Sequence, residues 1–317
     1  MRKALIYSID MATEHSGGDI KNCPRLLSSM DDATRKAIIA QLIEERNKRK
    51  FGDIMRVFQE SGDDWNQTMH TMLLKFIGGF DNAAAAMKLA KRVPYAIIMR
   101  ERSSSTAIEA LLIGTSGLLD LYDPSDGYIN RLWQEYYHLA AKYNLTAMQL
   151  EEWRLCRVRT PNHPTLRLAQ LAACYANGDI SMSSVTSCRT LEDIYKLFSG
   201  NASEYWLENI IPDTTMDNTR ARFGKMKSEM LGINFVAQMI YAYGYYTHSE
   251  TLHTQATSLL LQIPAERNKY VDEWNTYSRV ANNAIDSQAL IQLSREYCHA
   301  QRCHICPVGK HIKGSHQ

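Results

Sequence analysis

Three cysteines near the C-terminal end form the clearest chemical pattern in this sequence. Cys298, Cys303 and Cys306 have the spacing C-x4-C-x2-C. A single backbone turn with this spacing can aim three sulfurs at a common centre, which suits a thiolate-bound metal ion or an iron–sulfur cluster. We therefore predict a metal site in this turn, holding zinc or an iron–sulfur cluster.

The terminal turn has no fourth cysteine of its own. Cys23 from the N-terminal segment, His304 or His311 would complete the ligand set. Three thiolates with one imidazole favour zinc, whereas four thiolates leave zinc and iron–sulfur both open. The alternative is three reduced thiols packed at a helix end, because cysteine is among the most buried residue types. If a metal binds, its expected purpose is structural, since it would fasten the end of the chain.

A second group of residues surrounds a helix that Pro164 is predicted to begin. The candidate anion ligands in this group are Arg157, Arg159, Asn162 and Arg167. Unpaired amides at an exposed helix N-terminus and nearby guanidinium groups would converge on an anion. The alternative is an arginine network that holds the loop against buried carboxylates, because arginine serves both purposes.

Four polar residues stand in helical stretches that are otherwise apolar. We predict a buried polar network of Glu109, Gln170, Asp286 and Gln288. A buried carboxylate needs a partner, which Arg159 or Arg167 would supply. A hydrolase would instead need Glu109, Asn162, Arg167 and Asp286 in one cleft. The sequence contains no nucleophile elbow, zinc-protease motif, Walker loop or dinucleotide fingerprint.

Composition and charge limit the class of protein. With 317 residues, 45% of them hydrophobic, the chain can bury one large core or two smaller ones. The formal net charge is only +2, so a polyanion site requires local clustering of cations. The longest uncharged run, 230–248, is too polar to span a membrane and predicts a buried helix. Mostly isolated cysteines and the lack of a secretory signal predict a cytoplasmic protein without a disulfide framework.

These residues must be positioned by a mainly α fold. Residues 4–9 are the best strand candidate, and the pattern is helical from Asp31 onward. We predict an irregular multi-helix bundle with a short N-terminal β remnant and a cysteine-rich C-terminal turn. Residues 1–30 would be the remnant of a lost β-rich domain, and residues 31–317 the helical domain. The basic run 46–50 is interpreted as cations at a helix C-terminus, with a phosphate-facing patch as the alternative.

Several separated segments resemble one family in the same order. They are Glu109–Gly114, Arg159–Pro164 with Arg167–Ala172, Glu266–Asn268, Asp286–Leu290 and the cysteine turn. With these segments the chain resembles an uncharacterised bacterial family, domain of unknown function 2851. Family members look longer at the N-terminus, where a β-rich segment is similar to restriction-type nucleases. The resemblance therefore implies an N-terminally short member that lacks the catalytic half, with residues 4–9 as its last strand.

The cysteine turn alone is also similar to part of an iron–sulfur loop. This loop belongs to helical DNA glycosylases of the endonuclease III type. Its further cysteine is absent here, as are the catalytic lysine and aspartate of those enzymes, so glycosylase activity is not implied.

Three functions fit these patterns. The first is a helical module with a structural metal that binds nucleic acid or another polyanion, and whose binding weakens steeply with salt. The second is a protein-interaction scaffold without catalytic activity, which would expose an apolar patch. The third is a hydrolase of unknown substrate. We favour the first.

Overall fold

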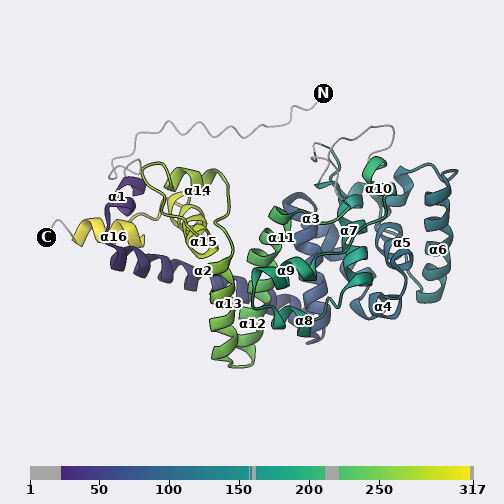
Figure 1. Ribbon diagram of the computed structural model, residues 1–317, viewed down its shortest axis with the longest axis horizontal. Coiled ribbons are helices and arrows are strands. Elements are labelled where there is room, and N and C mark those ends of the chain that lie inside the picture. Colours follow the sequence, from purple (N-terminus) through teal and green to yellow (C-terminus); the bar gives the residue numbers. More distant parts are fainter. Residues whose placement is uncertain (1–22, 157, 159–161, 211–220, 315–317) are drawn as a thin grey trace.

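The computed structural model describes residues 23–156, 158, 162–210 and 221–314. Within these ranges the chain is mainly helical (Figure 1), as predicted. In the same ranges, β-type pairing consists of one isolated antiparallel bridge between Pro264 and Asn283. The strand expected at residues 4–9 lies outside the described residues, so the β remnant stays a prediction.

Most of the α-helices follow one another after short connections, and longer ones lie before the helices that begin at Pro164, Lys225 and Pro307. In chain order they are α1 (Cys23–Ser29), α2 (Asp32–Glu60), α3 (Trp65–Arg92), α4 (Tyr95–Arg100), α5 (Ser105–Thr115), α6 (Gly127–Tyr143), α7 (Pro164–Asn177), α8 (Met182–Ser187), α9 (Leu191–Leu197), α10 (Tyr205–Glu208), α11 (Lys225–Leu231), α12 (Ala237–Tyr246), α13 (Glu250–Gln262), α14 (Lys269–Trp274), α15 (Ala284–Leu293) and α16 (Pro307–Gly314). Short 3-10 turns occur at Leu118–Leu121 and Leu150–Glu152, and π-helical turns at Gly232–Val236 and Ser294–Cys298.

Aspartate caps fix the start of the two longest helices. The Asp31 carboxylate accepts a hydrogen bond from the Thr34 N–H at 3.0 Å, and Asp64 accepts one from the Asn66 N–H at 2.7 Å. Helix α2 then continues to Glu60. The basic run 46–50 therefore lies in the middle of a helix, and its interpretation as cations at a C-terminus is wrong.

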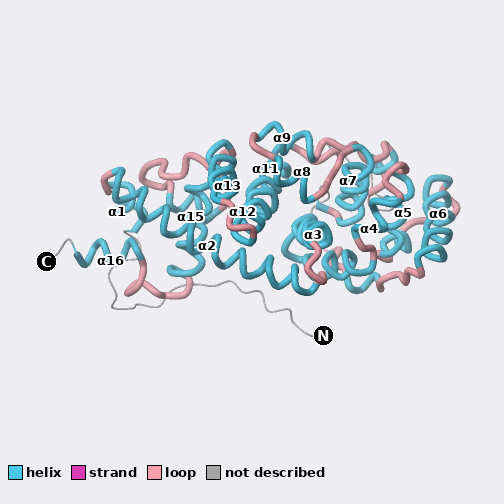
Figure 2. The backbone as a smooth tube through the Cα atoms, turned by 90° about the horizontal axis from the view of Figure 1, so that it is seen from below, coloured by secondary structure: helices cyan, strands magenta, loops and turns pink. Residues whose placement is uncertain are grey.

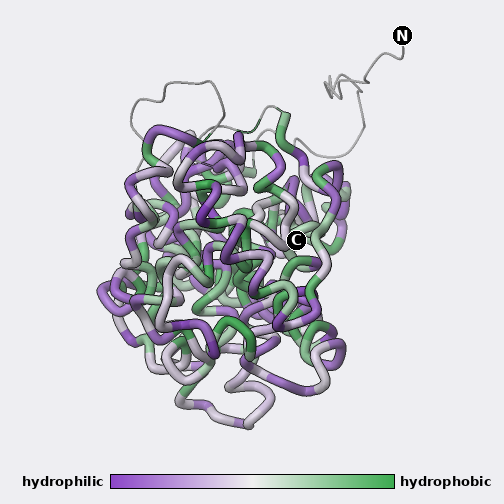
Figure 3. Tube along the Cα trace, turned by 90° about the vertical axis from the view of Figure 1, so that its right-hand side faces the viewer, coloured by the Kyte–Doolittle hydropathy of each residue, from purple (hydrophilic) through white to green (hydrophobic). Residues whose placement is uncertain are grey.

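Two hydrophobic cores share helix α2. Ile38 and Leu42 from its first half belong to a smaller core with α1, α14 and α15, whereas Ile54 and Val57 belong to a larger core with α3, α5, α7, α12 and α13. The molecule is elongated, with α1 and α16 at one end and α5 and α6 at the other (Figures 1 and 2). In the end view, hydrophobic segments lie mainly in the interior (Figure 3).

Close helix packing in the larger core depends on a small residue. A Cβ at Gly114 in α5 would lie 2.3 Å from the Tyr136 ring of α6, so no larger residue fits without displacing that ring. This contact holds α5 between α6 and α7, both of which pack against it. Glu109 and Arg167 are therefore carried by neighbouring helices of one rigid unit.

Helix α3 contains a kink that changes its direction. Gly79 has φ 67° and ψ −163°, a backbone conformation that residues with a side chain rarely adopt. Phe80 follows the kink and is 94% exposed. The kink thus exposes an aromatic ring to solvent directly after the first, buried part of α3.

The two ends of the described chain meet in the smaller core. Helix α1 packs against α16, and Leu27 and Val308 are both buried there. Residues 23–30, which were assigned to the N-terminal segment, are therefore helical and lie against the C-terminal helix. Over the described ranges, no helix combines the length and apolar character needed to cross a membrane.

Candidate functional site

The first turn of α7 holds a buried guanidinium group. Arg167 is 7% exposed, and its two terminal nitrogens donate to Gln170 Oε1 and Asn162 Oδ1, each at 2.9 Å. Its Nε has no partner within the described residues, and its Cζ lies 5.5 Å from the centre of the Phe223 ring. Burial lowers the pKa of Arg167 to about 10. This guanidinium is thus held by neutral groups alone.

A lysine from α11 lies within electrostatic range of Arg167. Lys227 is partly buried, and its Nζ donates to the Phe76 carbonyl at 3.2 Å. Burial, and then the charge of Arg167, lower the pKa of Lys227 to about 7. Among the described residues, no ion pair joins Lys227 or Arg167 to a carboxylate. Within the described residues, these two cations therefore have no carboxylate that balances their charge through an ion pair.

The positive charge continues from α11 across α3 to α2. Lys50 Nζ lies 6.0 Å from the centre of the Phe76 ring. The backbone carbonyl of the same Phe76 accepts the hydrogen bond from Lys227. Burial, followed by the charges of Arg46, Arg49 and Lys75, lowers the pKa of Lys50 to about 8. Contacts and charges thus link a series of cations, which we call the cationic strip: Arg46, Lys50, Lys75, Lys227 and Arg167.

The amino end of α7 is buried, although an exposed amino end had been predicted. His163 is the N-cap residue, but its side chain caps nothing, and its Nδ1 is buried without a partner within the described residues. Burial lowers the pKa of His163 to about 4, so the ring is neutral at pH 7. Asn162 is exposed, whereas Arg157 and Arg159 lie outside the described residues. Of the four predicted anion ligands, the structure brings together Asn162 and Arg167.

Glu109 is paired with neutral donors, and no arginine among the described residues contacts it through a hydrogen bond or ion pair; Arg159 lies outside those residues. Its Oε1 accepts from the Tyr128 hydroxyl at 2.7 Å and from the Trp206 Nε1–H at 2.6 Å. Glu109 is 2% exposed, and burial raises its pKa to about 7 although both hydrogen bonds favour the ionised form. The predicted pairing with Arg167 is therefore wrong: Arg167 instead binds Gln170 and Asn162.

The predicted single polar network is divided into separate local groups. Gln288 Nε2 donates to Glu266 Oε2 at 2.7 Å, while Asp286 accepts from the Asn282 N–H at 2.9 Å near the start of α15. Helix α15 lies in the smaller core, far from α5 and α7 in the larger core (Figure 1). Glu109, Asn162, Arg167 and Asp286 hence do not share a cleft, and the hydrolase site that required all four is wrong.

The four candidate metal ligands lie at one end of the molecule. Cys23 begins α1, Cys298 ends the π-helical turn after α15, and Cys303 and Cys306 precede α16. Each is a free thiol, and the charges of Cys303 and Cys306 raise the pKa of Cys23 beyond the effect of burial. In the described ranges, no three Cys, His, Asp or Glu side chains are placed so that they could hold one metal ion.

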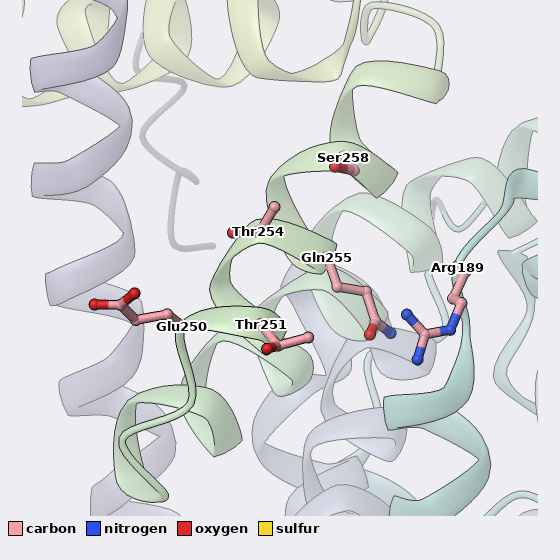
Figure 4. A pocket seen from close by; sticks show the side chains of 6 residues that line it. All are labelled: Arg189, Glu250, Thr251, Thr254, Gln255 and Ser258. Carbon is pink, nitrogen blue, oxygen red and sulfur yellow. The ribbon is translucent and has the colours of Figure 1, made fainter.

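Surface hollows offer no catalytic constellation. One of about 490 Å³ is lined by Arg189, Glu250, Thr251, Thr254, Gln255 and Ser258. Figure 4 shows that Glu250 points away from Arg189, and the Gln255 amide is used to bind the Thr186 and Cys188 carbonyls. A second hollow of about 290 Å³ includes Phe223, whose ring lies beside Arg167.

Lys227 and Lys75 were not found by sequence reasoning. Lys227 belongs to the short segment Lys225–Ser228, which has no motif, and Arg167 lies 60 positions away in the chain. The one available signal was the run 46–50, which contains Arg46 and Lys50 of the strip. Its alternative interpretation as a phosphate-facing patch stays a prediction.

The fold and these groups define an all-helical protein with a partly buried cationic surface and a separate cluster of thiols. Comparison with known families matches residues 2–269 to a family described as a protein of unknown function (DUF2851). The chain therefore belongs to this family, as the resemblance indicated. The match ends where α14 begins, so α15 and the cysteine turn lie beyond it. No curated protein and no solved structure matches the chain.

Proposed function

We propose that this protein is a helical module that binds nucleic acid through the cationic strip. The observation that carries this proposal is the pair of Lys227 and Arg167, which forms no ion pair with a carboxylate among the described residues. Burying a charge without a partner is costly, so such a pair favours an anion that supplies the missing charge. Phosphate groups meet this need, because guanidinium and ammonium groups both bind phosphate oxygens.

The strip extends over several helices, which favours a ligand with many charges over a single small anion. Lys50 on α2, Lys75 on α3 and Lys227 on α11 are partly exposed, whereas Arg46 and Arg167 lie buried at the two ends. Exposed Arg222 and Lys225 add charge beside Phe223. A polyanion would contact the lysines directly, while the buried arginines raise the local positive potential.

An exposed aromatic ring points to single-stranded nucleic acid as the polyanion. Phe80 is almost fully exposed and follows Phe76 by four residues, across the kink at Gly79. Phe76 in turn contacts both Lys50 and Lys227. Proteins that bind single strands combine a positive groove with aromatic rings on which bases stack. Other polyanions lack bases and would gain nothing from this ring.

The scaffold alternative has less support. Besides Phe80, large apolar side chains with more than half of their surface exposed include Tyr137, Met226 and Leu261, which belong to α6, α11 and α13. Single exposed apolar residues are normal on soluble proteins, and they do not mark an interface.

The test is binding of the full-length protein to a fluorescent single-stranded oligonucleotide at several salt concentrations. We expect affinity to fall steeply with salt, and the double variant K75Q/K227Q to bind at least ~10-fold more weakly. Each lost phosphate contact should reduce the slope of log K against log salt by about 0.7. Lys142→Gln is the control for the loss of one lysine charge outside the cationic strip, because Lys142 belongs to α6 at one end of the molecule (Figure 1).

Phe80→Ala separates nucleic acid from other polyanions. Loss of one stacked base costs about 1–3 kcal/mol, so oligonucleotide binding should weaken while heparin binding stays unchanged. Equal losses for both ligands would assign the site to polyanions in general. Binding that is independent of salt, or a K142Q variant as weak as K75Q/K227Q, would contradict the proposal.

A further inference from the structure

The four candidate thiols come from segments that are distant in sequence but packed together. Helix α1, which begins with Cys23, packs against α16, whose start follows Cys306 directly. Cys298 and Cys306 both belong to the smaller core or pack against it. The fold thus brings Cys23 to the terminal turn, although 274 positions separate it from Cys298 in the sequence.

The terminal turn is folded back tightly by backbone hydrogen bonds. The Arg302 N–H donates to the Tyr297 carbonyl at 2.8 Å, and the Cys306 N–H donates to the Arg302 carbonyl at 3.1 Å. Gln301 has φ 54°, which reverses the chain between Cys298 and Cys303. These bonds bring both sides of the turn to the same end of α15.

A glycine allows α16 to begin against this turn. A Cβ at Gly309 would lie 2.4 Å from the Cys303 carbonyl oxygen, so only glycine permits the approach. The backbone N–H groups of Val308 and Gly309 are directed at the Cys306 sulfur. Amides directed at a cysteine sulfur are groups that support a thiolate bound to a metal.

The four thiols lie close enough to one another to interact electrostatically. Cys298 interacts with Cys23, Cys303 and Cys306, and Cys23 interacts with Cys303 and Cys306 as well. All four candidate thiols therefore lie in the same region of the structure.

We propose that Cys23, Cys298, Cys303 and Cys306 together bind a metal centre, a zinc ion or an iron–sulfur cluster, that ties α1 to the C-terminal turn. This site is independent of the cationic strip. A tetrahedral zinc site with bonds of about 2.3 Å requires sulfurs roughly 3.8 Å apart. The described thiols do not meet the requirements of a single-ion site, and an iron–sulfur cluster places several atoms between its ligands. The arrangement therefore favours the cluster.

The first experiment measures metal content and the absorption spectrum of full-length protein purified without oxygen. Broad absorbance near ~400 nm with iron and sulfide identifies a cluster, and colourless protein with about one zinc per chain identifies the single ion. Both results support the proposal. Each of the variants C23S, C298S, C303S and C306S should lose at least ~5-fold in bound metal. Cys156→Ser is the matched control, because Cys156 is an exposed thiol outside the cluster.

A second measurement keeps the proposal testable if a variant fails to fold. The wild-type protein is alkylated with iodoacetamide, and the modified cysteines are mapped by mass spectrometry. Cys303 and Cys156 are both exposed, so without a metal they should react at similar rates. Protection of Cys303 that disappears after metal removal, while Cys156 reacts throughout, is the expected result.

Two outcomes would overturn the proposal. One is protein without stoichiometric metal in which Cys303 is alkylated as fast as Cys156. The other is full metal content in C23S combined with loss of metal in His304→Ala, which would replace the fourth thiol by an imidazole.

Discussion

Two buried charged groups on neighbouring helices show opposite designs. Glu109 in α5 receives hydrogen bonds from Tyr128 and Trp206, and its raised pKa allows it to become neutral near pH 7. Arg167 in α7 is held by neutral oxygens and lies beside Lys227, and the positive charge of the arginine remains at neutral pH. The carboxyl group is enclosed and satisfied, whereas the cations lack a counter-ion among the described residues.

This difference separates a structural group from a functional one. A buried acid that can bind a proton needs no ligand, and its two donors fix the packing of α5, α6 and α10. An arginine cannot lose its charge under ordinary conditions, so the cost of burial persists until an anion binds. We therefore assign Glu109 to the scaffold and the Arg167–Lys227 pair to ligand binding.

The largest expected effect comes from removing the acceptor at Glu109. Glu109→Leu leaves the Tyr128 hydroxyl and the Trp206 N–H buried without partners, so we expect a loss of about 2–4 kcal/mol in the free energy of unfolding. Glu109→Gln keeps an oxygen acceptor and should cost less than about 1 kcal/mol. Denaturant unfolding of both variants measures these changes in the free energy of unfolding. A leucine variant as stable as the glutamine variant would show that the two hydrogen bonds are not important.

A smaller effect of opposite sign is expected at Lys227. Lys227→Met removes a partly buried cation and should raise the free energy of unfolding by on the order of 1 kcal/mol at pH 6–7. A lowered pKa means that folding disfavours the charged lysine, so the gain shrinks as pH approaches the ordinary lysine value near ~10.4. Lys142→Met, an exposed control, should change stability by less than about 0.5 kcal/mol. Destabilisation by Lys227→Met would mean that the lysine has a structural role.

The smallest effect concerns how the difference in stability between Glu109→Gln and the wild-type protein depends on pH. Because the pKa of Glu109 is raised to about 7, the folded protein holds a proton there that the unfolded chain releases above its ordinary value. Its stabilising contribution is therefore complete below about pH 4.3 and lost as pH rises through 7. Relative to wild type, Glu109→Gln should gain about 1 kcal/mol between pH 6 and pH 8.5 in thermal unfolding. A difference that stays constant with pH would place the pKa elsewhere.

Sequence patterns predicted the contacts that depend on local spacing. Arg167 and Gln170 stand three positions apart on one helix, and they form a hydrogen bond. Asp31 caps α2 as its position before a helical pattern indicated. The family assignment and the mainly α fold were predicted in the same way, since both depend on the order of short segments.

Contacts between distant segments could not be predicted from such patterns. The partners of Glu109 come from α6 and α10, and nothing in its neighbourhood distinguishes tyrosine and tryptophan donors from an arginine. Lys227 comes within electrostatic range of Arg167 because it binds the Phe76 carbonyl of α3, a helix that packs against α7. Charge run 46–50 was assigned to a helix end because no local signal shows that α2 continues to Glu60.

Helix α2 has a consequence for how this chain can be divided. Since its first half completes one core and its second half completes the other, a cut within 32–60 would leave both fragments with an uncovered apolar surface. Such fragments would reassociate when mixed, and neither would be a useful truncation for separate study. The natural unit of the described chain is therefore the two hydrophobic cores together with helix α2, which both of them require.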